Sequence, residues 1–155
     1  MSDPQTNNSE QDFELLSFRI EEQEYCVDIM SVREIRGWTK ATPLPFSPPH
    51  VKGVINLRGT VLPVIDLSAR LGIGSIDGEE QNVIIVVSIG EEMAGLLVDA
   101  VSDILTVPRR ELQSPPEIGA DPSSCCVEGL LLVEGKLIRV LDLKIILPGD
   151  TKDAA

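Results

Sequence analysis

The 155-residue chain has few aromatic residues, so its core must be built from aliphatic side chains. Aromatic residues make up 3% of the chain, whereas hydrophobic residues make up 43%. The abundant Val, Ile and Leu are interrupted by 12 Gly and 11 Pro. Because β-branched residues favour strands and Gly and Pro favour turns, this composition predicts an all-β protein.

Positive charge is also scarce. The chain has 13 Lys and Arg against 25 Asp and Glu, which gives a net charge of −12 at pH 7. Nucleic-acid binding depends on basic side chains that neutralise phosphates, and anionic membrane surfaces attract the same side chains. The charge balance therefore excludes nucleic acid as a partner and disfavours a membrane surface.

Long hydrophobic runs are missing, and no signal peptide is expected. No apolar run approaches the roughly 20 residues that span a bilayer, and the N-terminus lacks the basic and apolar regions of a secretory signal. We therefore expect a cytoplasmic protein with no direct membrane insertion. Cys125 and Cys126 are adjacent and Cys26 lies in an apolar run, so all three are expected to be reduced thiols.

Patterns that carry catalysis are not found either. His50 is the one histidine, and no His/Cys cluster has the spacing of metal ligands. No Ser lies in a nucleophile-elbow motif. The glycine-containing stretch 72–80 resembles a phosphate loop only weakly, and its acidic residues would repel a phosphate. We expect no enzyme activity, no metal and no cofactor, which leaves binding as the function.

Two sequence elements occur twice, in the same order. "GVINLRGTVLPVIDL" at 53–67 returns as "GLLLVEGKLIRVLDL" at 129–143, and "IEEQEYCVDIMSVREI" at 20–35 aligns without gaps to "IGEEMAGLLVDAVSDI" at 89–104. Chance similarity between apolar strands is the alternative explanation. The agreement of two separate elements favours an internal duplication.

Each copy is predicted to contain two strands, a linker and a tight hairpin. Glycine after the tip residue is expected to adopt positive φ at Arg58-Gly59 and Glu134-Gly135. Asp66 and Asp142 precede short helical runs and are predicted N-caps, while Pro63 indicates an edge strand or a bulge. The expected architecture is two intertwined five-stranded barrels over residues 13–148, with the repeat boundary near 72–82. Residues 1–12 and 149–155 are expected to be disordered tails.

Arg58 is the part of the hairpin tip that does not recur, because Glu134 takes its place in the second copy. The fold therefore needs the glycine but not the arginine. Arg58 is then either an ordinary polar tip residue or a contact for a partner, held in place by Glu34. Apolar residues with the same pattern in both copies are either core or the lining of a site: Val32, Ile35, Val101 and Ile104.

Three segments resemble the chemotaxis coupling protein CheW family. They are "YCVDIMSVREIRG" (25–37), "TPLPFSPPHVKGVINLRGTVLPVIDLSARLG" (42–72) and "GLLVDAVSDIL" (95–105). The similarity extends from about Phe13 to Leu147, and the string "VKGVINLRGTVLPVIDL" (51–67) is specific. The resemblance implies two SH3-like barrels and a role as an adaptor that joins chemoreceptors to the histidine kinase CheA in membrane-associated arrays.

The resemblance also implies two binding surfaces. The helical hairpin tip of the receptor is expected in a groove between the barrels, with Glu34 paired to Arg58. The positions that match this groove are Val32, Glu34, Ile35, Arg58, Val83, Gly95, Val101 and Ile104. The regulatory domain of the kinase is expected on the first barrel, at Gly37, Trp38, Thr39, Lys40, Thr42, Lys52 and Gly53. Alternatives are an adaptor of another chemosensory system, such as one for surface motility, and a small ligand-binding barrel.

Overall fold

The computed structural model describes residues 12–74, 81–114 and 126–147 of the chain, and strands dominate these ranges. The elements are β1 (Asp12–Ile20), β2 (Gln23–Asp28), η1 (Ile29–Ser31), β3 (Val32–Gly37), β4 (Val51–Leu57), β5 (Thr60–Asp66), α2 (Leu67–Arg70), β6 (Val83–Ile89), β7 (Glu92–Val98), β8 (Ala100–Pro108), η2 (Arg109–Glu111), β9 (Val127–Val133), β10 (Lys136–Leu141) and α3 (Leu143–Ile146).

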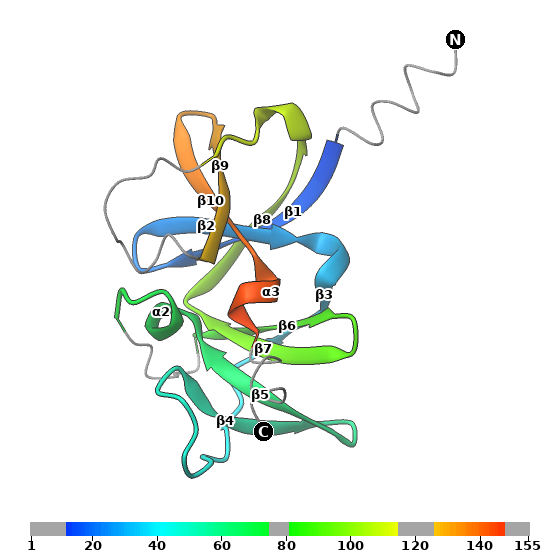
Figure 1. Ribbon diagram of the computed structural model, residues 1–155, viewed down its shortest axis with the longest axis vertical. Coiled ribbons are helices and arrows are strands. Elements are labelled where there is room, and N and C mark those ends of the chain that lie inside the picture. The colour runs from blue at the N-terminus through cyan, green and yellow to red at the C-terminus, as the bar shows by residue number, and fades with distance from the viewer. Residues whose placement is uncertain (1–11, 75–80, 115–125, 148–155) are drawn as a thin grey trace.

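The strands form two five-stranded sheets. Sheet A has the order β8-β1-β2-β10-β9, and sheet B has the order β3-β6-β7-β5-β4. Figure 1 shows sheet A in the upper half of the molecule and sheet B in the lower half. The all-β prediction with two five-stranded units is confirmed.

Each sheet takes strands from both sequence copies. Sheet A combines β1 and β2 of the first copy with β8, β9 and β10 of the second, and sheet B has the complementary set. The chain changes sheet at η1 and again between β7 and β8. Exchanging the two copies converts one strand order into the other, which supports the duplication. The strands β5 and β6, on either side of segment 72–82, belong to the same sheet; residues 75–80 of that segment lie outside the described ranges.

Irregularities of the strands repeat as well. The register shifts in β3 after Val32 and in β8 after Val101, and it shifts again in β4 and β9 at equivalent positions. The linker between β3 and β4 forms a bridge from Thr42 to Val54, and the corresponding bridge in the second copy joins Gln113 to Leu130. Bulges bend and twist strands, so their recurrence gives both sheets the same curvature.

Aliphatic side chains fill the interior, as the composition predicts. The main cluster of buried residues draws on both sheets, and a smaller cluster lies inside sheet A. Phe18 and Tyr25 contribute a stacked ring pair with centroids 6.2 Å apart. Full burial of each large aliphatic residue contributes about 1.5–3 kcal/mol, so this core holds the binding surfaces in fixed positions.

The predicted turns and caps are confirmed. The φ angles are 52° at Arg58 and 90° at Gly59, and 51° and 82° at Glu134 and Gly135. Both residues of each tip thus have the positive φ of a type I′ hairpin. The carboxylate of Asp66 accepts from the Ala69 amide at 3.2 Å, and that of Asp142 accepts from Lys144 at 3.0 Å.

Two local predictions need correction. Pro63 lies in β5, which is an inner strand, so the edge-strand alternative is wrong. The bulge alternative agrees with the register shift between Val51 and Gly53 in the β4–β5 pair, next to Pro63. The proline is tolerated because β5 pairs with β7 only from Val64 onward, so the missing N–H of Pro63 removes no bond to β7. Asp12, assigned to the N-terminal tail, opens β1 opposite Pro108. The remainder of both predicted tails, 1–11 and 149–155, lies outside the described residues.

The prediction of reduced cysteines agrees with the structure in the described residues. Cys26 is a buried free thiol and Cys126 is buried as well. Burial raises the pKa of Cys26 to about 12, with Glu128 and Glu24 adding to the shift. A thiol that stays protonated is a poor nucleophile, which makes Cys26 a core residue. Cys125 lies outside the described residues.

Candidate functional site

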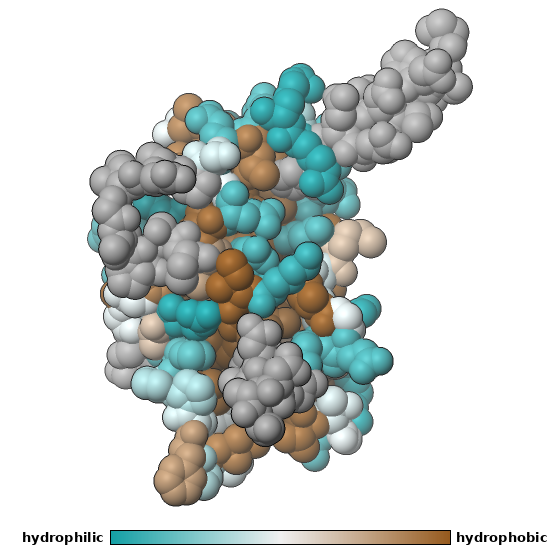
Figure 2. Space-filling view, in the orientation of Figure 1, coloured by the Kyte–Doolittle hydropathy of each residue, from teal (hydrophilic) through white to brown (hydrophobic). Residues whose placement is uncertain are grey.

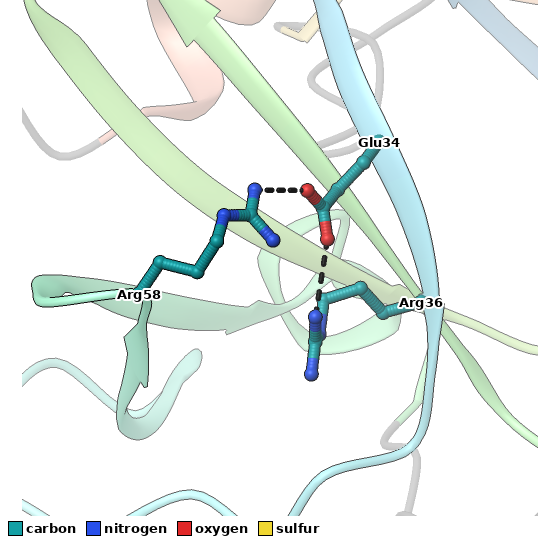
Figure 3. A network of polar contacts seen from close by, with 3 residues as sticks. All are labelled: Glu34, Arg36 and Arg58. Atoms are coloured by element: carbon teal, nitrogen blue, oxygen red, sulfur yellow. Dashed lines mark hydrogen bonds and ion pairs between the residues drawn. The ribbon is translucent and has the colours of Figure 1, made fainter.

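An ion pair links the two edge strands of sheet B. The Nη2 atom of Arg58, at the tip between β4 and β5, donates to Oε1 of Glu34 on β3 at 2.5 Å. The Arg58 side chain is 71% exposed and that of Glu34 is 26% exposed. Figure 3 shows the guanidinium reaching from the hairpin tip to the carboxylate on β3. The pairing predicted from the sequence is confirmed.

A second arginine shares the same carboxylate. Arg36 Nη1 donates to the other oxygen of Glu34 at 3.1 Å, and Figure 3 shows the two arginines on either side of Glu34. Glu34 and Arg36 are two residues apart on β3, so strand alternation places them on one face. Sequence analysis did not identify Arg36, although this i, i+2 spacing was the available signal. Two guanidinium groups on one carboxylate leave one local positive charge.

The charges reinforce one another. Hydrogen bonds from Arg58 first and Arg36 second lower the pKa of Glu34 below its ordinary value, and the bond to Glu34 raises the pKa of Arg58. Both groups therefore stay charged at neutral pH. The site is a fixed charge cluster in which Arg58 keeps most of its surface open to solvent.

Apolar residues of the predicted groove divide into two groups. Val32, Val83 and Val101 are half-buried and pack against the main core. Ile35 and Ile104, at equivalent positions of β3 and β8, are 48% and 56% exposed. Each isoleucine therefore sits on the edge strand of its sheet with about half of its surface free for a partner.

Gly95 differs from the other groove positions because it is buried in β7. A Cβ at this residue would meet Ile84 Cγ2 at 2.7 Å and Leu62 Cδ1 at 3.8 Å. The position therefore faces the packed interior of sheet B. Gly95 allows Ile84 to pack closely behind the surface and offers no side chain to a partner.

The segment predicted to bind the kinase follows β3 and returns along β4. Gly37, Thr39 and Lys40 are exposed, whereas Trp38 is half-buried against the main core. The backbone of Thr42 pairs with Val54 through bonds of 2.8 and 2.9 Å. The indole of Trp38 therefore covers core residues, and the exposed part of this segment consists of polar and basic side chains.

Gly53 and Lys52 of that segment have structural roles. Gly53 is buried with φ 149°, and a Cβ there would collide with the backbone carbonyl of Thr42. Lys52 Nζ lies 3.9 Å from the buried carboxylate of Asp66. The structure thus brings Thr42, Lys52 and Gly53 together, with Gly53 setting the path of the linker.

Comparison with known proteins identifies the family. The family model described as CheW-like domain matches residues 14–150, which is nearly the whole described fold. This chain belongs to the CheW-like family.

Several relatives of this CheW-like chain are named CheW. The chemotaxis protein CheW of Rhizobium meliloti is 50% identical over 142 residues, which cover 92% of each chain. Protein FrzA of Myxococcus xanthus is 30% identical over 79% of this chain and 76% of its own length. The crystal structure of the scaffolding protein TtCheW from Thermoanaerobacter tengcongensis superposes with a TM-score of 0.79 at 33% identity, covering 86% of both chains.

Two negative observations apply to the part of the CheW-like chain that the structure describes. Within 12–74, 81–114 and 126–147, no three His, Cys, Asp or Glu residues are arranged to hold a metal ion. No helix in these ranges has the length and apolarity needed to cross a membrane.

Proposed function

We propose that this chain is a non-enzymatic cytoplasmic adaptor that couples chemoreceptors to the histidine kinase CheA in membrane-associated arrays. Its membership of a family of chemotaxis scaffolds supports the proposal. The observation that carries it is the Arg58–Glu34 pair, because an exposed charge pair that occurs in one copy only is not required by the fold.

The receptor surface of the proposal comprises the charge cluster and the exposed isoleucines, with Ile35 on the opposite face of edge strand β3 from Glu34 and Arg36. A helical hairpin that docks in a groove needs apolar anchors and a few placed polar groups. Ile35 and Ile104 offer the apolar area, and Arg58 offers free donors beside Glu34. We assign Val32, Val83 and Val101 to this surface as half-buried apolar positions that pack against the main core, and Gly95 as a buried position without a side chain.

The kinase surface of the proposal is the linker that follows β3. It comprises Gly37–Thr42 with Lys52 and Gly53, at the end of sheet B away from sheet A (Figure 1). Because Arg58 lies at the hairpin tip and Thr42 lies beside Val54 in the middle of β4, receptor and kinase can occupy different faces. Separate faces are what a coupling protein requires.

A second candidate is an adaptor of another chemosensory system, such as one for surface motility. The match to protein FrzA shows that the similarity extends to relatives that are not named as chemotaxis proteins. The 50% identity to CheW of Rhizobium meliloti against 30% to FrzA favours the chemotaxis assignment.

A co-sedimentation experiment tests the proposal. Vesicles that display the cytoplasmic fragment of a chemoreceptor from the same organism are mixed with its CheA, with and without this chain. The proposal expects CheA to sediment only when the chain is present. Sedimentation of CheA that does not depend on the chain would exclude a coupling role in this system, and coupling only to receptors and kinases of a motility system would favour the second candidate.

A further inference from the structure

The chain contains a long stretch without acidic residues. Between Glu34 and Asp66 there is no Asp or Glu, although the chain as a whole has 25. The same stretch contains four basic residues: Arg36, Lys40, Lys52 and Arg58. It covers the second half of β3, the β3–β4 linker, β4 and most of β5, so positive charge is concentrated in this part of the sequence in a protein of net charge −12.

The linker inside this stretch exposes an aromatic ring. The relative exposure of Phe46 is 104%, and that of Leu44 is 45%. Figure 1 shows the linker as the cyan loop at the lower end of the molecule, beyond β4, and Figure 2 shows hydrophobic surface projecting there. Fold stability gains nothing from burial of the Phe46 ring, because the ring is not buried.

The backbone that carries the ring is held in an unusual conformation. Phe46 has φ 63°, which is uncommon for a bulky residue that is not glycine. The Ser47 hydroxyl donates to the Leu44 carbonyl at 3.0 Å, and the Val51 amide donates to the Pro48 carbonyl at 3.0 Å. Pro45 and Pro48 restrict φ on both sides. The ring is therefore presented by a constrained loop.

We propose that Phe46, with Leu44 beside it, is the anchor of the kinase contact and inserts into an apolar pocket that acidic side chains surround. This inference rests on the proposed function, and it names the residue and the chemistry of that contact. Exposed aromatic anchors dominate the energetics of many interfaces, and a constrained loop loses little conformational entropy on binding. Lys40 lies six residues before Phe46 in the same acid-free stretch, so a carboxylate-rimmed pocket complements the loop.

The charge distribution of the chain indicates whether the Phe46 loop binds a partner protein or a lipid surface. An anionic bilayer would attract the four basic residues, but it would repel the rest of a chain whose net charge is −12. A partner protein can place its carboxylates opposite the basic residues only. The observations therefore favour a protein pocket over a membrane.

The first test removes the ring without straining the loop. Asn tolerates positive φ, so Phe46→Asn should leave the melting temperature unchanged or slightly raised. The probe is the isolated regulatory domain of CheA from the same organism. We expect its Kd to weaken about tenfold or more, whereas Phe46→Tyr, which keeps the ring, should bind like wild type. Leu132→Asn is the matched control, because Leu132 is also an exposed apolar residue (59%) on sheet A.

The second test concerns charge. Lys40→Glu should weaken binding of the same domain and flatten the salt dependence, since exposed charges are screened by added salt. Vesicles containing phosphatidylglycerol should not bind the wild-type chain. Vesicle binding that is lost in Phe46→Asn would overturn the inference in favour of a membrane anchor.

The outcomes separate the inference from the proposed function. If the kinase domain binds wild type and Phe46→Asn equally well, the inference is wrong and the coupling function stands. If the domain does not bind wild type while a receptor fragment does, the proposed kinase contact and the inference both fail.

Discussion

The guanidinium of Arg58 and the carboxylate of Glu34 join the two ends of sheet B, because β3 and the β4–β5 hairpin form its opposite edges. The equivalent positions in the second copy are Asp103 and Glu134, two acidic residues that cannot form such a pair. Sheet A nevertheless has the same strand order. The fold therefore forms without this ion pair, and its presence in sheet B requires another reason, which we propose to be the receptor.

The first prediction concerns Arg58→Glu. The substitution places a second negative charge beside Glu34 and removes the exposed donors, so we expect loss of receptor-fragment binding. Folding should persist, because the Arg58 side chain is 71% exposed. Kinase-domain binding should also persist. A circular-dichroism melt and two binding isotherms on the same preparation measure all three quantities.

The internal duplication supplies the control for this prediction. Glu134→Arg introduces the opposite change at the equivalent tip and should leave receptor binding unchanged. Wild-type receptor affinity in a folded Arg58→Glu variant would make Arg58 an ordinary turn residue.

The second prediction concerns the titration of Glu34. Arg58 and Arg36 lower its pKa below the ordinary value of 4.5. Because the folded-state pKa is the lower one, the stabilisation by the pair is present above pH 4.5 and is lost as pH falls through the lowered pKa. An NMR titration of the Glu34 carboxyl carbon checks the direction. Arg58→Gln should raise this pKa more than Arg36→Gln, and the reverse order would contradict the contacts described above.

Much of the fold can be predicted because local rules determine it. The tip glycines, the caps at Asp66 and Asp142, and the strand pattern depend on residues close in sequence. The duplication adds long-range information, since whatever both copies keep is required by the fold. The pair of Glu34 with Arg58 could be predicted from the same comparison of the two copies, because Arg58 does not recur in the second copy and the fold therefore does not require it.

The assignment of strands to sheets could not be predicted. β3 and β8 have equivalent patterns and could pair in either sheet. The three-residue turn η1, capped by the Asp28 side chain on the Met30 amide at 3.0 Å, directs β3 into sheet B. The inner position of Pro63 follows from the parallel pairing of β5 with β7, which no local pattern encodes.

The third prediction concerns a charge conflict in the second copy. Glu128 occupies the position equivalent to Lys52, and a cleft places it near Asp142 and Asp28. Partial burial first, then these two carboxylates, raise the pKa of Glu128. Since the folded-state pKa is above 4.5, stability falls as pH rises between 4.5 and the raised pKa, and the deficit persists at pH 7.

Replacing Glu128 with Lys should remove this conflict and recreate the pairing of Lys52 with Asp66. We expect a gain of about 0.5–1 kcal/mol in the free energy of unfolding at pH 7, kept small by solvent screening, and a Tm rise of about 1–4 °C. Glu128→Gln should give part of this gain in the free energy of unfolding, and only at pH values above the interval between 4.5 and the raised pKa of Glu128. Melts at pH 4 and pH 7 measure the difference; equal stability of wild type and both variants at pH 7 would show that no conflict exists.

The fourth prediction concerns Gly53, which packs directly against the linker backbone at Thr42. Its φ of 149° favours glycine, and a Cβ would collide with the Thr42 carbonyl, so Gly53→Ala should destabilise the fold by about 2–4 kcal/mol. Gly37→Ala is the matched control for the stability measurement alone, because nothing lies within 4 Å of its Cβ position but Gly37 belongs to the proposed kinase surface. Relief of the collision requires the linker to move away from Val54, which displaces Lys40 and Phe46 together. Kinase-domain binding should therefore weaken in Gly53→Ala at temperatures where the variant is still folded, while receptor binding at Arg58 is retained. Equal weakening of both partners would mean that the linker and the hairpin tip respond as one unit, and unchanged binding of both would place the kinase contact away from this linker.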